Sequence, residues 1–323
     1  MFIRQLQLTN FKRFTDLTID LSDQTVPPTL VLIIGINGSG KSAIFDAFEA
    51  ISSQTKDETM LPSSYYRKNP HSEFQVKIEF ADQTVAIEHD RHIGSDHLNA
   101  TSFYGRSSLR QVPQLTRTQL GTGQPVNLAR DSDRPKRYID RDHRFENDLD
   151  RITSLILKDF YRSDQAASQI KTKYLQPINE AFSRIFDGNE ATQLTLLELI
   201  PPLEEQVADI IFKKGQSEIH YNYLGNGEKE IFNVLVNLLV RKSFYQETIY
   251  YLDELDLHLN TKLQYRFLTE IVENWIPPNC QLWTASHSLG FIEYANEVDH
   301  AAIIDLDDLD FDQPQTLKAI YRK

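Results

Sequence analysis

Apolar side chains recur at every second position in several short runs of the first ninety residues. These runs cover residues 2–8, 17–21, 74–80 and 85–87. A period of two is typical of strands that bury one face and expose the other. We therefore expect half-buried antiparallel strands in the N-terminal part of the chain.

Other stretches are continuously apolar or are apolar at helical spacing. Continuous runs predict buried strands at residues 30–34, 249–252, 281–285 and 301–306. Two further strands are expected at residues 207–212 and 219–221. Spacings of three to four residues predict helices at residues 43–51, 146–186 and 228–241. The second of these stretches fits two helices, with a helical hairpin as one arrangement, and both are far too short for a long coiled-coil arm.

Residues 94–140 have weak periodicity and many Gly, Ser, Gln, Arg and Pro residues, which predicts a long and partly flexible insertion. Nine basic residues lie in or beside it: Arg106, Arg110, Arg117, Arg130, Arg134, Lys136, Arg137, Arg141 and Arg144. The same stretch holds four aspartates: Asp131, Asp133, Asp140 and Asp142. Two hypotheses stay open. Either the arginines pair with these aspartates in a solvated loop, or the last six basic residues contact nucleic-acid phosphates.

Residues 35–42 read Gly-Ile-Asn-Gly-Ser-Gly-Lys-Ser, which is a complete phosphate-binding pattern GxxxxGK[ST]. The pattern lies between an expected strand and an expected helix, as the chemistry requires. Glycine-rich backbone can curl its N–H groups around phosphate oxygens, and the helix N-terminus adds partial positive charge. Lys41 would reach the β- and γ-phosphates, and the Ser42 hydroxyl would hold Mg²⁺. This context favours a nucleotide site over a plain glycine turn.

Two adjacent carboxylates, Asp253 and Glu254, follow the apolar run 249–252. Asp253 can bind Mg²⁺ through water, and Glu254 is placed to polarise the attacking water. Acidic pairs are common at strand ends, so it is the upstream phosphate loop that favours the functional interpretation.

Two further motifs follow the same logic. Residues 224–230, Leu-Gly-Asn-Gly-Glu-Lys-Glu, open an expected helix, and such a turn presents free N–H groups to an anion. The alternative is a plain N-cap formed by Asn226. His287 follows the expected strand 281–285. A lone histidine is usually structural, but this position after a buried strand favours a functional role.

Composition narrows the class of protein. The 323-residue chain is 40% hydrophobic and 25% charged, and its net charge is −12. These values are ordinary for a globular protein and exclude a uniformly basic surface. The single cysteine, Cys280, excludes a disulfide framework and a Cys-rich zinc site. No apolar run approaches the roughly 20 residues that span a bilayer, and no secretory signal is recognisable. We therefore expect a cytoplasmic protein without a membrane partner.

The order of the motifs resembles ABC-type ATPases of the SMC and RecF group, especially AAA-like ATPases related to the OLD family. Residues 8–14, Leu-Thr-Asn-Phe-Lys-Arg-Phe, look like that group's L-x-N-F-[KR]-x-F start. The other matches are Walker A at residues 35–42, the signature at 224–229, Walker B at 253–254, the D-loop at 259–260 and the switch histidine at His287. Residues 253–260 and 279–283 further resemble ATPases of bacterial phage-defence loci, including Septu-type ATPases.

The resemblance implies an α/β fold in two lobes, with a RecA-like mixed sheet, an antiparallel β subdomain and a helical lobe. Its expected parts are residues 1–93 with Walker A, residues 94–204 with the basic insertion and helical lobe, and residues 205–323 with the signature, Walker B and switch histidine. The implied catalytic residues are Glu254, His287 and Asp253, and the implied Mg²⁺ ligands are Ser42 and Asp253. The implied ATP contacts are Gly35, Asn37, Gly38, Ser39, Gly40, Lys41 and Ser42, and, toward a partner subunit's nucleotide, Gly225, Asn226, Gly227 and Glu228.

The implied activity is Mg-ATP hydrolysis coupled to formation of a homodimer or a higher even-numbered homo-oligomer. Its expected output is control of DNA or RNA binding, or of a separate effector nuclease, in anti-phage defence or DNA repair. The alternative is a nucleotide-gated scaffold that binds ATP stably and holds a partner nuclease or toxin inactive. A third hypothesis, the motor subunit of a membrane transporter, is disfavoured by the long interval between Ser42 and Leu224.

The chain departs from the group's pattern at two points. Gly225 replaces the usual signature serine, whose hydroxyl contacts a γ-phosphate, and Gln54 and Gln75 are both weak candidates for a Q-loop glutamine. The stretch after His287 is too short for a nuclease domain, so a nuclease is expected on another chain. The carboxylates that follow the last expected strand are expected to form a solvated acidic turn, not a metal site: Asp305, Asp307, Asp308 and Asp310.

Overall fold

The computed structural model describes residues 1–55, 61–81, 84–88, 91–93, 98–116, 137–138, 140–162, 166–187, 192–200 and 207–322. Its helices are α1 (Lys41–Thr55), α2 (Ser63–Tyr66), α3 (Arg144–Arg162), α4 (Ala167–Ile185), α5 (Asn226–Arg241), α6 (Thr261–Glu270) and α7 (Leu289–Glu297). Two shorter helical segments are the 3-10 turn η1 (Tyr221–Tyr223) and the π-helical η2 (Ile271–Trp275).

The strands of the described ranges form three sheets. A five-stranded parallel sheet has the order β13 (Ala301–Asp305), β3 (Leu30–Ile34), β12 (Gln281–Ala285), β11 (Ile249–Asp253) and β7 (Phe103–Arg106). A six-stranded sheet has the order β14 (Pro314–Lys318), β2 (Phe14–Asp20), β1 (Ile3–Phe11), β4 (Gln75–Phe80), β5 (Thr84–Glu88) and β6 (Arg91–Ile93). A three-stranded antiparallel sheet has the order β10 (Ser217–His220), β9 (Asp209–Lys214) and β8 (Leu194–Ile200).

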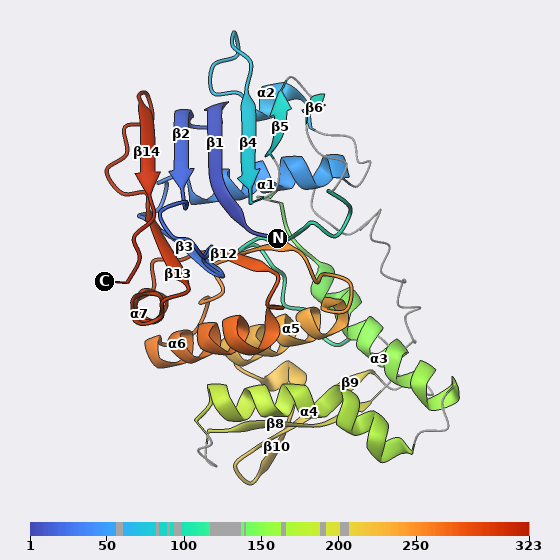
Figure 1. Ribbon diagram of the computed structural model, residues 1–323. Coiled ribbons are helices and arrows are strands. Elements are labelled where there is room, and N and C mark those ends of the chain that lie inside the picture. Colours follow the sequence, from blue (N-terminus) through green and yellow to red (C-terminus); the bar gives the residue numbers. More distant parts are fainter. Residues whose placement is uncertain are drawn as a thin grey trace.

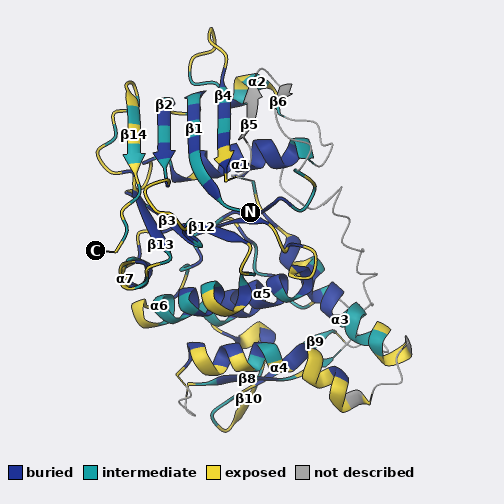
Figure 2. Ribbon diagram, viewed as in Figure 1, coloured by how far each residue is buried: buried dark blue, intermediate teal, exposed yellow. Residues whose placement is uncertain are grey.

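The sheets and helices are stacked in layers (Figure 1). The six-stranded sheet lies at the top of the view, and α1 lies between it and the five-stranded sheet. Helices α5, α6 and α7 lie on the other side of the five-stranded sheet, and α4 and the three-stranded sheet lie beyond them. In Figure 2 the five-stranded sheet and most of α1 are buried. The phosphate loop therefore leaves a strand that is covered on both faces, as is usual in parallel sheets.

Alternate residues of the five-stranded sheet enter two separate hydrophobic cores. In β3, Val31 and Ile33 pack with α1 and the six-stranded sheet, whereas Leu30 and Leu32 pack with α5 and the helical layer. Tyr251 and Tyr250 of β11 divide in the same way. These strands read as continuous apolar runs because both faces are buried, although each side chain still alternates between faces.

The α/β fold class and the predicted strands and helices are confirmed, but four strands of the described ranges were missed. β7 lies inside the expected insertion and pairs in parallel with β11, so part of that insertion is an edge of the central sheet. β6, β8 and β14 were not predicted either, nor were α2, α6 and α7. β7 is only four residues long, and its Gly105 lies so close to the Tyr251 ring that an added Cβ would be 2.0 Å from it. A short run interrupted by glycine gives almost no periodic signal.

The basic residues of the expected insertion divide between the interior and the surface. Arg106, Arg110 and Arg144 are buried, and the Arg106 Nε and Arg144 Nη2 atoms lie 2.7 and 2.9 Å from Asp142 Oδ2. Arg144 is 3% exposed, so the hypothesis that it contacts nucleic-acid phosphates is wrong for this fold. Arg141 is exposed, and Arg137 pairs with Asp140 at 3.0 Å. The remaining members lie outside the described residues: Arg117, Arg130, Asp131, Asp133, Arg134 and Lys136.

Candidate nucleotide-binding site

The phosphate loop has a backbone that depends on glycine. The φ angles of Gly35, Gly38 and Gly40 are +145°, +87° and +99°, values that side chains with a Cβ rarely adopt. Space is also restricted, because a Cβ on Gly40 would lie 2.5 Å from the Phe14 ring. The loop leaves β3 and enters α1 at Lys41. The predicted strand, loop and helix are therefore present in the predicted order.

The polar side chains of the phosphate loop differ in their hydrogen bonds and in their exposure to solvent. Lys41 Nζ donates to the carbonyl oxygens of Gly35 at 2.5 Å and Ile36 at 3.0 Å, so the ammonium group lies across the loop itself. The buried Ser39 hydroxyl finds no hydrogen-bond partner among the described residues. Asn37, Gly38 and Ser42 are exposed. The loop thus combines a retracted cation, an unsatisfied hydroxyl and an exposed face, which fits a phosphate ligand.

Parallel strands bring the separate motifs to one edge of the sheet. β12 lies between β3 and β11, so the phosphate loop, His287 and the Asp253-Glu254 pair all leave the carboxyl edge. The Ser286 N–H donates to Ile33 O at 3.1 Å, and the Glu254 N–H donates to Ala285 O at 3.0 Å. The carboxyl edge of an open α/β sheet is where such folds bind ligands.

Asp253 is only 3% exposed at the end of β11. Burial raises the pKa of its carboxyl group to about 7, and the charge of Glu254 acts in the same direction, while Arg110 and Lys41 oppose the shift. A divalent cation would favour the ionised form of such a carboxylate. Glu254 is half-buried and has a φ of +45°, which is unusual for a residue with a side chain. The Walker B turn therefore combines a desolvated acid with a strained neighbour.

His287 is exposed at the same edge, while both flanking serines are buried. The Ser288 hydroxyl accepts a hydrogen bond from the Phe291 N–H at 3.4 Å and caps α7. The strand before it and the helix after it thus fix the backbone of His287, and its imidazole faces solvent beside the phosphate loop and the carboxylate pair.

The signature residues open α5, but the N-cap is Gly225 and not Asn226, as the alternative interpretation had it. Glycine has no side chain to cap the helix, and the Gly225 N–H instead donates to Glu228 Oε2 at 3.0 Å. Gly225 and Asn226 are exposed. Gly227 faces inward, because a Cβ there would lie 2.7 Å from His258 O in the turn after Walker B. Its glycine is thus explained by close packing within the chain.

Two neighbours of the phosphate loop were not predicted. The Ile36 N–H donates to Asp307 Oδ1 at 2.7 Å, so one member of the expected solvated acidic turn is attached to the loop. On the other side, Arg13 stacks on the Phe311 ring at 4.0 Å and approaches Gly38 and Gly40. Within the described ranges, no group of three or more Asp, Glu, His or Cys residues is arranged to hold a metal ion.

The Q-loop candidates lie away from the motif edge. Gln75 begins β4 in the six-stranded sheet, and Gln54 lies thirteen residues into α1, about 20 Å along the helix from Lys41. The segment after β7 occupies the edge beside Walker B instead, and its Arg110 contacts the backbone of Asp253 and Glu254. No sequence signal marked this arginine, because only the strand pairing brings it to the site.

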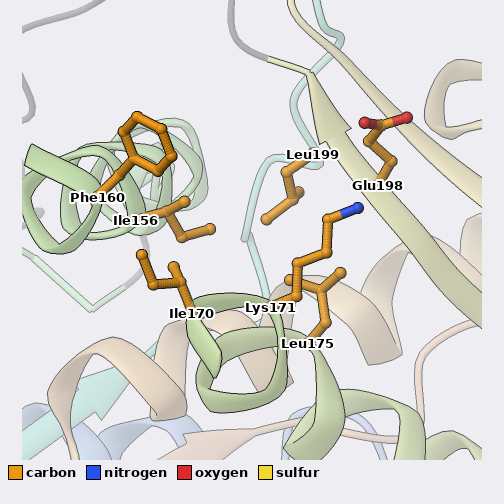
Figure 3. Close-up of a pocket in the computed structure, with 7 residues that line it drawn as sticks. All are labelled: Ile156, Phe160, Ile170, Lys171, Leu175, Glu198 and Leu199. Carbon is orange, nitrogen blue, oxygen red and sulfur yellow. The ribbon is translucent and has the colours of Figure 1, made fainter. Parts of the chain in front are cut away.

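A separate apolar pocket lies in the helical lobe (Figure 3). Its volume is about 160 Å³, and it is formed between the C-terminal half of α3, the start of α4 and the end of β8. Its lining residues are Ile156, Phe160, Ile170, Lys171, Leu175, Glu198 and Leu199. None of them belongs to a nucleotide motif.

Residues 1–109 match the AAA ATPase domain family. A search of curated proteins finds no match for the chain. No helix in the described part of the chain has the length and apolar character needed to cross a membrane.

Solved structures with a similar fold include heads of SMC proteins. One is the Smc head domain of Pyrococcus furiosus bound to the C-terminal domain of ScpA, with 14% identity, a TM-score of 0.52 and coverage of 99% of this chain and 96% of that one. A second, a head bound to the C-terminal winged-helix domain of ScpA, has 16% identity, a TM-score of 0.52 and coverage of 99% and 98%. The SMC head domain of Thermotoga maritima has 18% identity, a TM-score of 0.49 and full coverage of both chains.

The family match spans the phosphate loop, and the parallel sheet places Asp253, Glu254 and His287 at the same edge as this loop. The expected ATPase is thereby confirmed, whereas the OLD-like phage-defence subtype stays a prediction. The chain is an ATP hydrolase whose fold is that of SMC head domains.

Proposed function

We propose that this ATPase works as a nucleotide-driven dimerisation switch. The observation that carries the proposal is the position of exposed apolar side chains. Ile36 in the phosphate loop is 70% exposed, Leu289 beside the switch histidine is 71% exposed, and Tyr223 before the signature is 81% exposed. Large apolar side chains gathered at motifs point to surfaces that are covered in an assembly.

Within one chain, the described residues fit ATP and Mg²⁺. The glycine backbone, the unsatisfied Ser39 hydroxyl and the buried Asp253 carboxylate suit a phosphate chain with a dication. Mg²⁺ would be held by Ser42 and Asp253 and would neutralise charge on the phosphates. Lys41 would exchange its loop carbonyls for phosphate oxygens. Glu254 would orient the attacking water, and His287 would contact the γ-phosphate from the neighbouring strand.

The signature would serve the nucleotide of a second copy. Gly225 and Asn226 are exposed at the start of α5, where unpaired N–H groups favour an anion. Gly225 supplies no hydroxyl, so this contact rests on backbone N–H groups, Asn226 and the helix terminus. ATP would then be buried between two copies, and hydrolysis would release them.

We infer that a separate protein receives this change. Two of the heads with a similar fold are described as bound to a domain of ScpA, which supports a protein partner. Direct contact with nucleic acid has less support, because Arg144, one of the six basic residues expected to make it, is buried in the fold. A nuclease partner and a role in phage defence or repair stay predictions. The alternative function, a nucleotide-gated scaffold, would differ from this switch because the chain would bind ATP but hydrolyse it at a negligible rate.

The dimer is testable through its exposed apolar side chains. In a Glu254→Gln background that retains ATP, Mg-ATP is expected to produce a dimer in light scattering. Adding Leu289→Asp should raise the dimer dissociation constant at least about tenfold, since a buried unpaired charge opposes association. Val26→Asp is the matched control, because Val26 is 77% exposed in the loop that precedes β3 at the opposite edge. A protein that stays monomeric with ATP at every accessible concentration would refute the proposal.

A composite site also predicts complementation. Lys41→Ala and Gly225→Asp chains should each be inactive alone, the first without phosphate binding and the second through repulsion of the partner's phosphates. Mixing them should restore part of the turnover, because one composite site then has an intact loop and an intact signature. Gly225→Ala should stay active, since its Cβ would lie 3.4 Å from Glu228 Oε2, an ordinary contact. Gly227 is unsuitable because any side chain there collides with His258. Mixtures as inactive as the separate chains would argue against shared sites.

A further inference from the structure

Arg110 lies in the segment after β7 and is buried among three functional segments. The backbone on either side of Arg110 is fixed by the segment before α3: the Gln111 N–H donates to Asp142 O at 2.8 Å, and the Asp142 N–H donates to Leu109 O at 3.1 Å. A guanidinium group offers five N–H donors in a rigid plane. The position of this plane is therefore set by the fold before any ligand arrives.

All parts of the guanidinium group are in use. Nη1 donates to Ser107 O at 2.7 Å and to Asp253 O at 2.6 Å. Nη2 donates to Glu254 O at 3.1 Å and lies 2.6 Å from Glu230 Oε1, to which Nε also donates at 2.7 Å. One side chain thus connects the β7 segment, the Walker B turn and helix α5.

The contact with Walker B falls where the backbone is least favourable. Glu254 has a φ of +45°, and such a conformation persists only when the surroundings hold it. Arg110 donates to the carbonyl oxygens of Asp253 and Glu254, which belong to the peptides before and after the Glu254 Cα atom, while the Glu254 N–H donates to Ala285 O. These bonds fix the direction in which both carboxylates leave the strand.

The contact with α5 joins the same turn to the signature. Glu230 lies in the second turn of α5, whose first residues form the signature. Glu230 is 3% exposed. Separating it from Arg110 would leave two buried charges without partners, so the two side chains are expected to move together. A displacement of the start of α5 would therefore be transmitted to the peptide between the two Walker B carboxylates.

We propose that Arg110 is a positioning residue for ATP hydrolysis, which sets the Walker B turn from the position of the signature helix. The inference rests on the proposed roles of Asp253, Glu254 and the signature. When the signature of one chain binds the nucleotide of its partner, helix α5 shifts, and Arg110 passes this shift to Glu254 of the same chain.

Arg110→Lys tests the inference, because lysine keeps the charge beside Glu230 but its three N–H donors cannot satisfy Glu230 and three carbonyl oxygens at once. We expect kcat to fall at least about tenfold, with the Kd for ATP changed less than about threefold. Arg241→Lys is the matched control: Arg241 is also a buried arginine on α5, but it lies at the end of the helix opposite the signature, where it pairs with Asp148. It should leave kcat nearly unchanged.

A double variant separates positioning from a general structural role. If Arg110 acts through Glu254, Arg110→Lys should cause almost no further loss in the Glu254→Gln background, since coupled residues are not additive. Glu230→Gln, which keeps an oxygen acceptor, should give a smaller loss of kcat and serves as a second probe should Arg110→Lys not fold.

The outcomes are distinct. The inference alone would be overturned if Glu254→Gln lowers kcat but Arg110→Lys has a normal kcat. If Arg110→Lys does not fold, a normal kcat of Glu230→Gln would overturn it in the same way. Losses that multiply in full in the double variant would also overturn it, because Arg110 would then act independently of Glu254. Normal turnover of Glu254→Gln would instead refute the proposed function beneath it.

Discussion

Replacement of Glu254 by glutamine is expected to slow ATP hydrolysis at least about a hundredfold while ATP stays bound. Glutamine keeps the size of the side chain, so the backbone turn held by Ala285 and Arg110 should persist. What would be lost is the negative charge to which we assign the orientation of the attacking water and the acceptance of its proton. Lys41→Ala should behave differently and abolish ATP binding, because it removes the cation that lies over the phosphate loop.

Equilibrium binding of ATP and phosphate release under single-turnover conditions would measure the two steps separately. Glu247→Gln is the matched control, since Glu247 is exposed just before β11, at the opposite end of the strand that carries Glu254. It should bind and hydrolyse ATP like the unmodified chain. Normal turnover in Glu254→Gln would exclude this carboxylate as the general base.

Asp148→Asn is expected to lower the free energy of unfolding by about 3–5 kcal/mol, because removing one member of a buried charge cluster leaves its partners uncompensated. Asp148 in α3 contacts the guanidinium group of Arg241 and lies 3.5 Å from Arg106 Nη1. All three side chains are almost fully buried. The substitution keeps the shape of the side chain, so the loss reports charge and not volume.

Asp159→Asn in the same helix is the control. Asp159 also pairs with a cation, Lys173, at 2.6 Å, but at the surface, where such pairs contribute at most about 1 kcal/mol. Denaturant unfolding of both variants would give the difference through the shift of the midpoint at constant slope. Equal losses in the two variants would show that the buried cluster does not stabilise the fold.

The sequence was most informative where one physical constraint dominates. The run at residues 30–34 and the glycine loop after it predict strand, loop and helix, because a phosphate loop needs that order. The edge formed by Asp253, His287 and the loop follows once parallel strands are assumed. By contrast, β7 is too short to show a period, and Arg110 has no motif around it. Its role depends on which strand pairs with β11, which is a property of the whole sheet.

Charge counting failed for a related reason. A local excess of arginine suggested an outward-facing basic surface, but Arg106 is buried against Asp142 and Asp148, and Asp148 belongs to α3, beyond the counted stretch. A net charge along the chain does not specify which side chains meet in space. The need for glycine at position 227 likewise comes from a segment distant in the sequence, because a Cβ there would lie 2.7 Å from His258 O.

The position of β3 in the sheet has a consequence for how the protein is made. The strand that carries the phosphate loop lies between β12 and β13, which come from residues 281–285 and 301–305. Contacts this distant in the chain close slowly, and they cannot close before their partners leave the ribosome. Both hydrogen-bonding edges of Leu30–Ile34 therefore lack their partner strands until most of the chain has been translated. We expect nascent chains that end before β12 to bind ATP poorly and to recruit chaperones.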